Sequence, residues 1–598
     1  MLERTASEEL AIAKPPALAV RRLCYCVLVA LTIGGMIWLA VTALEPGGFG
    51  ALDLILVVLF AVTLPWYVIG FWNATIGFLI MRLARDPVAA VTPAAALVRG
   101  DEPITASTAI LMCIRNEPPE RAARYLAPLV EGLAADPAAR RFHLYVLSDT
   151  DQPAIAAAEE VHFAAFTARW RERVAVTYRR RPVNTGFKAG NIRDFCERWG
   201  ADHEFAIVLD ADSVMTAAAV LRLVRIMQAD PRLGILQSLV TGMPSTSAFA
   251  RLFQFGMRLG MRSYTIGSAW WQADCGPYWG HNAAVRLKPF LAHCQLPTLP
   301  DGALVGGHVL SHDQIEAVLM RRAGYEVCVL AEEGASFEEN PPTLLEFIRR
   351  DLRWCQGNMQ YWHFVRIPGL RPVSRYQLLF AMLMFLGSPA WVGLLVIGTI
   401  AVALAGEPAA FVRADAGLAV FTLELMLWFA PTIATALDVL ARPQLRQAFG
   451  GGTRFLASVL ANVLFFLLLA PIMWVAHTAF LARLLFGRSV GWSVQTRDDH
   501  AVPFTLAWRQ LWPQTLLGLW TVIVLGLTVP AAIPYALFIA GGPLLAIPLA
   551  VVTALPAAGR ALLGIGLGRL PEETAPPPEI TALALPAIEL SPTRRRDP

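Results

Sequence analysis

Two carboxylates one residue apart, Asp210 and Asp212, directly follow an apolar run of the sequence. An Asp-x-Asp pair on a turn supplies hard oxygen ligands that can share a divalent cation with a diphosphate group. Such a cation would neutralise a departing diphosphate. Most Asp-x-Asp pairs are solvated turns or helix caps, so it is the position of this pair, at the end of a predicted strand, that favours chemistry. Asp149 follows another predicted strand and is a candidate for holding a nucleotide.

A basic segment lies between these two acidic sites. It begins with three consecutive arginines at residues 179–181 and continues through two glycines to Lys188 and Asn191. The glycines permit a tight backbone near a ligand. Lysine occurs at only three positions in a chain with 50 basic residues, so Lys188 indicates a need for a compact ammonium group. The alternative is a basic surface loop before a helix that Asn191 caps.

A third carboxylate, Asp313, follows Ser311 and His312 at the start of a predicted amphipathic helix. It is either a helix N-cap, which is frequent for aspartate, or a general base at a helix start. The neighbouring His312 raises the possibility of a hydrolase triad. The chain has no Gly-x-Ser-x-Gly nucleophile elbow, so we reject that possibility.

A fourth group of candidates is the arginine-rich segment 349–358. Arg350 and Arg353 could clamp a diphosphate, because guanidinium groups bind phosphate in a bidentate manner. Trp354 could cover the face of a sugar. The alternative is a basic helix close to a membrane, with an interfacial tryptophan.

These residues need elements that position them, and residues 82–376 alternate between strand-like and helix-like stretches. This alternation predicts a parallel sheet covered by helices. Ligands of such sheets bind at the carboxyl ends of the strands, where Asp149 and Asp210 are expected. Strands are predicted at 109–114, 143–147, 173–178 and 205–209, and helices at 119–134 and 154–170.

The composition indicates a membrane protein. Hydrophobic residues make up 56% of the 598 residues, charged residues only 16%, and the mean hydropathy is +0.50. Soluble domains carry about 25% charged residues. The net charge of +4 is too small to indicate a nucleic-acid partner. The eight cysteines are scattered without a Cys-x-x-Cys pair, which excludes a zinc framework.

Apolar runs of about 20 residues are long enough to cross a bilayer. They predict an N-terminal segment, two membrane helices, the α/β domain, two more helices, an interfacial helix with a loop, and a final pair of helices. The segment that follows is rich in proline, so we expect a largely disordered tail. The corresponding residues are 1–22, 23–82, 83–376, 377–440, 441–514, 515–555 and 556–598. We therefore expect six spans.

The arginines predict the orientation of these helices. Arg21 and Arg22 precede the first span, and arginines also follow the second, so the positive-inside rule places the N-terminus and the α/β domain in the cytoplasm. The loops 442–454 and 483–509 are both basic. If both are cytoplasmic, the apolar segment between them is an interfacial or re-entrant helix, kinked near Pro471. The alternative is an ordinary span. Both termini are expected in the cytoplasm.

Together these motifs resemble the processive, inverting family 2 glycosyltransferases, the group that includes cellulose, hyaluronan and chitin synthases. That resemblance implies a GT-A domain set between membrane helices. The residues that carry it are Asn116-Glu117, Asp149, Lys188-Ala189-Gly190-Asn191, Asp210-Ala211-Asp212, Asp313 and the Arg-x-x-Arg-Trp sequence that ends at Trp354.

Within this group the chain is most similar to the synthases of osmoregulated periplasmic glucans, from about residue 105 to about residue 580. Two departures from the cellulose synthase pattern agree with this: Ser311-His312-Asp313 replaces Thr-Glu-Asp, and Arg350 replaces a glutamine. Residues 492–497 resemble the gating loop of cellulose synthases, although an interfacial tryptophan is an alternative. Further matching stretches are 178–181, 194–200, 208–213, 278–282, 310–313, 317–324, 353–358, 469–471, 477–478, 491–492, 497–499 and 570–573.

The resemblance implies a hexosyltransferase of the bacterial inner membrane that uses UDP-glucose to build a β-1,2-linked glucan. It implies Asp313 as the base, and Mg²⁺ or Mn²⁺ on Asp210 and Asp212, helped by Lys188 and the arginines. It places other residues near substrates: Asn116, Glu117 and Asp149 at the nucleotide, Arg350 and Arg353 at the diphosphate, and Trp279, His281 and Trp354 at the acceptor. The growing glucan and the lipid bilayer are expected partners, as is an acyl carrier protein or a periplasmic glucan-processing protein.

Three alternatives stay open on the sequence alone. The chain could synthesise another β-glycan of cellulose or hyaluronan type. It could act on a polyprenyl-phosphate acceptor, although such enzymes often lack the Arg-x-x-Arg-Trp helix. It could also be a non-catalytic transporter, which would have no use for an Asp-x-Asp pair at a strand end.

Overall fold

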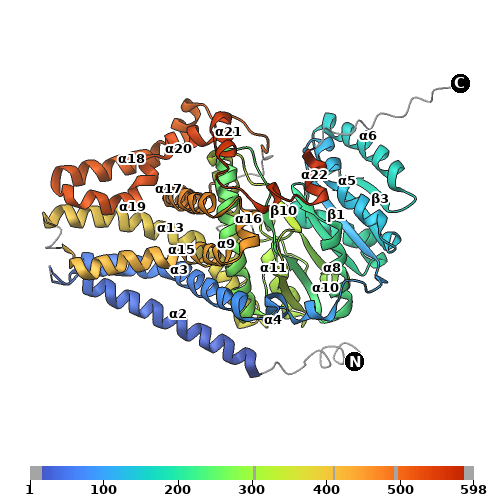
Figure 1. Cartoon of the computed structure of the whole chain (residues 1–598), viewed down its shortest axis with the longest axis horizontal. Coiled ribbons are helices and arrows are strands. Elements are labelled where there is room, and N and C mark those ends of the chain that lie inside the picture. The colour runs from blue at the N-terminus through green and yellow to red at the C-terminus, as the bar shows by residue number, and fades with distance from the viewer. Residues whose placement is uncertain (1–15, 47, 301–304, 408–410, 490–495, 585–598) are drawn as a thin grey trace.

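The computed structural model describes residues 16–46, 48–300, 305–407, 411–489 and 496–584. Figure 1 shows an α/β domain on one side of the molecule and a bundle of long helices on the other. The domain lies in the chain between helix α3 (Ala51–Leu83) and helix α13 (Pro372–Ala405). The expected arrangement, an α/β domain inserted between long apolar helices, is therefore confirmed.

The domain is built on a seven-stranded sheet with the strand order β3-β2-β1-β4-β8-β6-β9. All neighbouring strands are parallel except β8, which is antiparallel to both β4 and β6. The strands are β1 Thr108–Ile114, β2 Phe142–Ser148, β3 Ala175–Arg180, β4 Phe205–Asp210, β6 Leu233–Ser238, β8 Ala283–Arg286 and β9 Glu326–Leu330. A small second sheet has the order β5-β10-β7, with β5 Ser213–Met215, β7 Thr241–Gly242 and β10 Ser336–Glu338.

Alternate residues of each central strand enter two separate cores. In β1, Ile110 and Met112 pack with the helices on one face, whereas Ala109 and Leu111 pack with those on the other. This two-residue period is the geometry of an extended strand covered on both faces. The covering helices are α5 Pro119–Ala135, α6 Pro153–Trp170 and α8 Ala217–Ala229 on the first face, and α7 Phe187–Trp199, α10 Leu287–His293 and α11 Asp313–Arg322 on the second.

The four predicted strands and two predicted helices are present with ends shifted by at most a few residues. Because β1, β2 and β4 are parallel neighbours, their carboxyl ends meet at one edge of the sheet. Asp149 and Asp210 therefore lie at the same edge, as expected.

Helix α9 (Ala248–Gln272) joins the domain to the bundle and stands across the ends of the bundle helices in Figure 1. Two glycines allow its backbone to touch helix α3. A Cβ atom on Gly77 would lie 1.8 Å from the Ser263 carbonyl oxygen, and one on Gly267 would lie 1.8 Å from the Asn73 carbonyl oxygen. Such contacts cannot accommodate a side chain, so these two glycines fix the domain against the bundle.

Six helices are long and apolar enough to cross a membrane, judged by length and composition among the described residues. The chain therefore has the architecture of a multi-pass membrane protein. The six are α2 Pro16–Ala43, α3, α13, α15 Ala414–Ala441, α17 Gly452–Leu485 and α18 Phe504–Thr528. A further pair, α19 Ile533–Leu544 and α20 Ala546–Thr553, is bent by 53° between Pro530–Leu544 and Ala546–Thr553.

The last two membrane helices differ from their predicted bounds. They were expected within residues 515–555, but α18 already begins at Phe504, so the arginine-containing stretch before residue 515 is helical as well. Helix α17, expected at the membrane surface, is one continuous helix that contains Pro471. Its length and composition do not distinguish it from a span.

The prediction that the tail from residue 556 is largely disordered is wrong up to residue 584. Helix α21 (Pro556–Ile565), a short 3-10 turn (Pro571–Glu573) and helix α22 (Pro578–Ala584) are present there, each with proline in its first turn, where proline is tolerated. The prolines that suggested disorder therefore begin helices. Residues 585–598 lie outside the described part of the chain.

Acidic residues of this tail pair with arginines of α9. Glu572 accepts a hydrogen bond from Arg258 at 2.9 Å, and Glu573 forms an ion pair with Arg251 at 2.9 Å. Leu570 packs into a buried cluster with Phe255. The sequence did not reveal these partners, because they are distant in the chain.

Candidate active site

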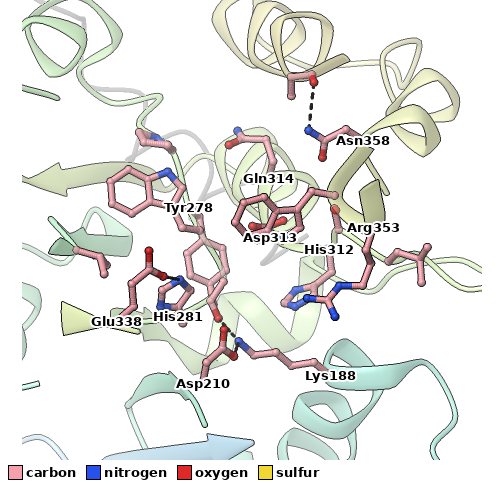
Figure 2. Close-up of a pocket in the computed structure, with 18 of the residues that line it drawn as sticks. Lys188, Asp210, Tyr278, His281, His312, Asp313, Gln314, Glu338, Arg353 and Asn358 are labelled. Carbon is pink, nitrogen blue, oxygen red and sulfur yellow. Dashed lines mark hydrogen bonds and ion pairs between the residues drawn. The ribbon is translucent and has the colours of Figure 1, made fainter. Parts of the chain in front are cut away.

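The Asp-x-Asp turn follows β4 directly and lies at the carboxyl edge of the sheet. Lys188, at the start of α7, donates hydrogen bonds to Asp210 and, at 2.7 Å, to the Gly280 carbonyl oxygen. Burial alone would raise the pKa of Asp210, but Lys188 and His281 hold it down to about 2. Figure 2 shows the Lys188–Asp210 pair at one end of a pocket, with Asp313 further in. Lys188 and Asp210, both selected from the sequence as candidate site residues, are therefore in contact.

Asp212 pairs with a residue that comes much later in the chain. Its carboxylate contacts Arg497 at 2.5 Å. The following residues also touch the domain, since Asp498 accepts a hydrogen bond from Arg121 at 2.9 Å and Asp499 accepts one from Thr246. Arg497 ends the stretch that resembled a gating loop, although it was not among the predicted site residues. Residues 492–495 of that stretch, including Trp492, lie outside the described part of the chain.

Asp149 lies on the turn after β2. Both of its oxygens accept hydrogen bonds from Arg181, at 2.7 and 2.8 Å. Burial raises the pKa of Asp149, and the bonds from Arg181 partly offset this. Beside it, burial raises the pKa of Glu117 to about 7 despite the nearby Arg497. Asn116 bonds to the side chain of Asp151 at 2.7 Å and therefore links the turns that follow β1 and β2.

Asp313 is the first residue of α11. His312 holds the N-cap position, and its side chain makes no capping hydrogen bond there. Asp313 is therefore not the N-cap of this helix, which was the alternative to a role as general base. Gly280 faces it so closely that an added Cβ atom would lie 3.1 Å from the Asp313 Cβ. Burial and the Asp313 carboxylate together raise the pKa of Tyr361.

His312 points to a different partner. Its Nδ1 atom lies 2.8 Å from a Glu316 carboxylate oxygen, and both side chains are buried. The pair joins the N-cap residue of α11 to a residue of its first turn.

Arg350, Arg353 and Trp354 lie on α12 (Leu344–Met359). Arg350 donates a hydrogen bond to Asn340 at 3.0 Å, and its guanidinium carbon lies 4.7 Å from the centre of the Trp354 ring. Burial lowers the pKa of Arg350, and burial together with Arg350 lowers that of Arg353 to about 10. Two guanidinium groups in one buried place would be stabilised by an anion.

Hydrogen bonds to neighbouring strands hold the segment that precedes β8. The Trp279 backbone N–H donates to Gln237 at 2.8 Å, Gly280 has a φ of +79°, and the Asn282 side chain donates to Ser336 at 2.8 Å. His281 lies 3.6 Å from a Glu338 oxygen on β10. The left-handed backbone at residue 280 favours glycine, and the absence of a side chain there lets the segment approach Asp313 closely.

One cavity of about 580 Å³ brings together all but one of the predicted site residues. Asn116 is not among the residues that line it. The predicted residues that do are Glu117, Asp149, Lys188, Asp210, Asp212, Trp279, His281, Asp313, Arg350, Arg353 and Trp354. Lining residues that the sequence analysis did not select are Tyr278, Gln314, Glu338, Tyr361 and Arg497.

The cavity does not end at the sheet. It continues between α9, α13 and α3, where Tyr264, Tyr376, Phe380 and Trp66 line it. The Phe380 ring stacks with Tyr376 at 5.4 Å on one side and with Trp66 at 5.1 Å on the other. An aromatic passage therefore leads from the carboxylates towards the helical bundle.

Asp210 and Asp212 fit a divalent cation that a substrate helps to hold. Lys188 contacts the Oδ1 atom of Asp210, and Arg497 contacts the Oδ2 atom of Asp212. No group of three or more His, Cys, Asp or Glu side chains in the described part of the chain converges on a common metal position. Mg²⁺ is usually bound by one or two carboxylates together with substrate phosphates and water, so two carboxylates are sufficient.

The sheet, the Asp-x-Asp turn after β4 and Asp313 across the cavity together define a GT-A glycosyltransferase fold and site. The chain belongs to the glycosyl transferase family group 2, whose sequence model matches residues 205–551. The model of glycosyl transferase family 2 also matches residues 109–293.

Curated relatives share most of this chain. It is 37% identical over 541 residues to glucans biosynthesis glucosyltransferase H of Pseudomonas paraeruginosa, a match that covers 88% of the chain and 62% of that protein. The protein of the same name from Pseudomonas entomophila is 36% identical over 89% of the chain and 63% of its own length. The chain thus spans less than two thirds of these relatives.

Among solved structures, a mannosyltransferase from Pyrobaculum calidifontis in complex with GDP-Man and Mn2+ is similar at 17% identity and a TM-score of 0.36. The match covers 62% of this chain and 99% of that one.

Proposed function

We propose that this protein transfers glucose from UDP-glucose to a growing β-1,2-linked glucan. The observation that carries the proposal is the single cavity that runs from Asp210 and Asp212, past Asp313, into the aromatic passage towards the bundle. A transferase that releases a small product needs no such passage, whereas one that extends a polymer does. The named relatives support the choice of glucan.

The reaction is a single in-line displacement, which converts an α-linked donor into a β-linked product. The acceptor hydroxyl loses its proton to Asp313, attacks the anomeric carbon and displaces UDP. A general base of this kind contributes about 10²- to 10⁴-fold to a rate. Gly280 faces Asp313 without a side chain of its own, which leaves room beside the carboxylate.

The departing diphosphate gains one negative charge as its bond to the sugar breaks. Lys188, Arg350 and Arg353 line the same cavity and are positioned to stabilise that charge. Burial lowers the pKa of both arginines, and a bound diphosphate would offset the cost of holding the two guanidinium groups there. Mg²⁺ or Mn²⁺ held by Asp210 and Asp212 would supply further positive charge to the diphosphate.

The acceptor end of the cavity is aromatic. Trp354 is 42% exposed, so part of its ring is open to a ligand, and Arg350 covers another part. Tyr376, Phe380 and Trp66 continue the aromatic lining towards the bundle. Flat apolar rings can pack against the faces of successive sugar units, while the sugar hydroxyls stay free to bond to polar groups or water.

We place the domain and both termini in the cytoplasm, with six spans in the bacterial inner membrane and α17 along the membrane surface. The placement of α17 is supported by its contacts, because residues along this helix touch α9 and α12 on the side of the bundle that faces the domain. Asn462 donates to the Leu252 carbonyl of α9 at 2.9 Å, and His477, further along, bonds to Asp351 of α12. A helix that crossed the membrane would meet the domain at one end only.

The test is incubation of the purified protein, in detergent or nanodiscs, with UDP-glucose and a divalent cation, followed by linkage analysis of the product. We expect a β-1,2-linked glucan and release of UDP. UDP-galactose serves as the donor control, and the Asp313→Asn protein as the enzyme control. A product with other linkages would make the protein a different β-glycan synthase, and transfer to polyprenyl phosphate alone would reject polymerisation.

A further inference from the structure

Glu159 is a fully buried carboxylate behind the proposed nucleotide end of the site. It lies on α6, is 0% exposed, and is not among the residues that line the cavity. Three hydroxyl groups donate hydrogen bonds to it: Ser148 at 2.6 Å, Thr150 at 2.5 Å and Tyr178 at 2.8 Å. No arginine, lysine or histidine of the described residues forms an ion pair with it.

The chemistry of this group indicates a purpose other than stability. Burial of a carboxylate is costly unless hydrogen bonds compensate it, and a buried charge is weak evidence that a residue stabilises a fold. An ionised carboxylate only accepts hydrogen bonds, so it forces each of the three hydroxyls to point towards it. The bonds from Ser148 and Thr150, at 2.6 and 2.5 Å, have the short length that a charged acceptor makes. Glu159 therefore fixes the rotamers of three side chains.

Two of those side chains flank Asp149. Ser148 precedes it and Thr150 follows it on the turn after β2. The Thr150 hydroxyl, held by Glu159, also accepts a hydrogen bond from the Asn116 backbone N–H at 2.8 Å. Asn116 has a left-handed backbone with φ of +59°, a conformation that needs support from its surroundings. One carboxylate thus links the turns that carry Asp149 and Glu117.

The third donor is different. Tyr178 lies on β3, stacks on Phe163 of α6 at 5.5 Å, and has no place on either turn. Its bond to Glu159 holds the helix to the edge of the sheet. Thr150 thus forms a positioning branch to Asn116, whereas Tyr178 forms a packing branch that reaches the turn only at Ser148.

We propose that Glu159 is a positioning residue for the uridine diphosphate end of the site, acting through Ser148 and Thr150 on Asp149 and Asn116. This rests on the proposed function, since it takes the turns after β1 and β2 as the nucleotide-binding turns. Glu159 touches no substrate. Its effect is to hold the Asp149 carboxylate and the backbone beside Glu117 in a binding geometry before the nucleotide arrives.

The experiment measures UDP binding by the full-length protein in detergent, together with its melting temperature and its transfer kinetics. In the Glu159→Gln variant the side-chain NH₂ cannot accept a hydrogen bond. Either the bond from Thr150 to one oxygen or the bonds from Ser148 and Tyr178 to the other are therefore lost at nearly unchanged volume. We expect UDP to bind about tenfold more weakly or worse, with KM for UDP-glucose raised and kcat nearly unchanged. The control is Glu160→Gln on the next residue of the same helix, where the side chain is exposed.

Two further variants separate positioning from packing. Thr150→Val removes the hydroxyl that connects Glu159 to Asn116, and should weaken UDP binding as much as Glu159→Gln does. Tyr178→Phe removes the packing branch, and should lower the melting temperature while leaving UDP affinity within about twofold. If Glu159→Gln fails to fold, the contrast between Thr150→Val and Tyr178→Phe decides the question.

Wild-type affinity for UDP in a folded Glu159→Gln protein would overturn the proposal. Equal losses of UDP affinity in the Thr150 and Tyr178 variants would also overturn it, because the effect would then come from packing. Absence of UDP binding by the wild-type protein would instead reject the proposed function, and this inference with it.

Discussion

Arg497 and Asp212 form an ion pair at 2.5 Å, although one follows helix α17 and the other belongs to the Asp-x-Asp turn of the α/β domain. The pair places a cation from the bundle side of the chain at the carboxylate proposed to hold the metal. It also anchors residues 496–503, whose neighbouring side chains Asp498 and Asp499 contact the domain as well. The segment after α17 is thus part of the site.

We expect Arg497→Gln to release this segment, because the ion pair is its buried anchor. Amide hydrogen exchange in residues 496–503 should become faster than in the wild-type protein. Arg488→Gln is the control, since Arg488 is exposed and lies before the described segment resumes. Unchanged exchange in the Arg497 variant would show that the other contacts hold the segment without the ion pair.

Asp313→Asn should abolish most transfer while UDP still binds. Asparagine keeps the shape of the side chain but cannot accept the proton, so the rate should fall by about 10²-fold or more. Lys188, Asp210 and Asp212 are untouched, so UDP affinity should stay near that of the wild type. Transfer at a near wild-type rate would remove Asp313 from the mechanism and make its neighbour His312 the next candidate.

Removal of divalent cations should stop glucose transfer. Excess chelator should abolish the activity, Mg²⁺ or Mn²⁺ should restore it, and Asp212→Ala should not be restored by either ion. The reason is that the protein offers only carboxylates and the substrate diphosphate to hold the ion. Full activity in excess chelator would reject the metal assignment.

Tyr278→Phe should make the protein more stable. The Tyr278 hydroxyl is buried and has no hydrogen-bond partner among the described residues, and a buried unsatisfied polar group costs about 1–3 kcal/mol. We expect a higher melting temperature. In Tyr145→Phe, by contrast, the lost hydroxyl bonds to His203 at 2.9 Å, so the melting temperature should fall. A lower melting temperature for Tyr278→Phe would reveal a partner such as ordered water.

Cysteine labelling tests the orientation. A cysteine at Glu45, between α2 and α3, should react with a membrane-impermeant reagent from the periplasm, whereas one at Ser489, just after α17, should not. Exposed Cys24 and Cys26 are first replaced by serine to remove background reaction. Reaction of the Ser489 cysteine from outside would make α17 a span and would reject its placement along the membrane surface.

The elements around Asp210 were predictable because their signals are local. The apolar runs that become β1, β2 and β4 are short, buried at all but one position each and followed by turns with acidic residues, and parallel strands bring such turns to one edge. The chemical roles proposed for Asp210, Lys188 and Asp313 rest on residue type and position. Their presence in one cavity follows from the strand order.

What only the tertiary structure decided depends on contacts between distant residues. Hydropathy shows only that α17 is long and apolar. Its hydrogen bonds to α9 and α12, through Asn462 and His477, show that it packs beside these two helices. Proline content suggested a disordered tail, yet Glu572 has a buried arginine, Arg258, as its partner. Composition and periodicity describe a residue by its neighbours in sequence, whereas an ion pair or a close packing contact is a property of two segments that the fold alone brings together.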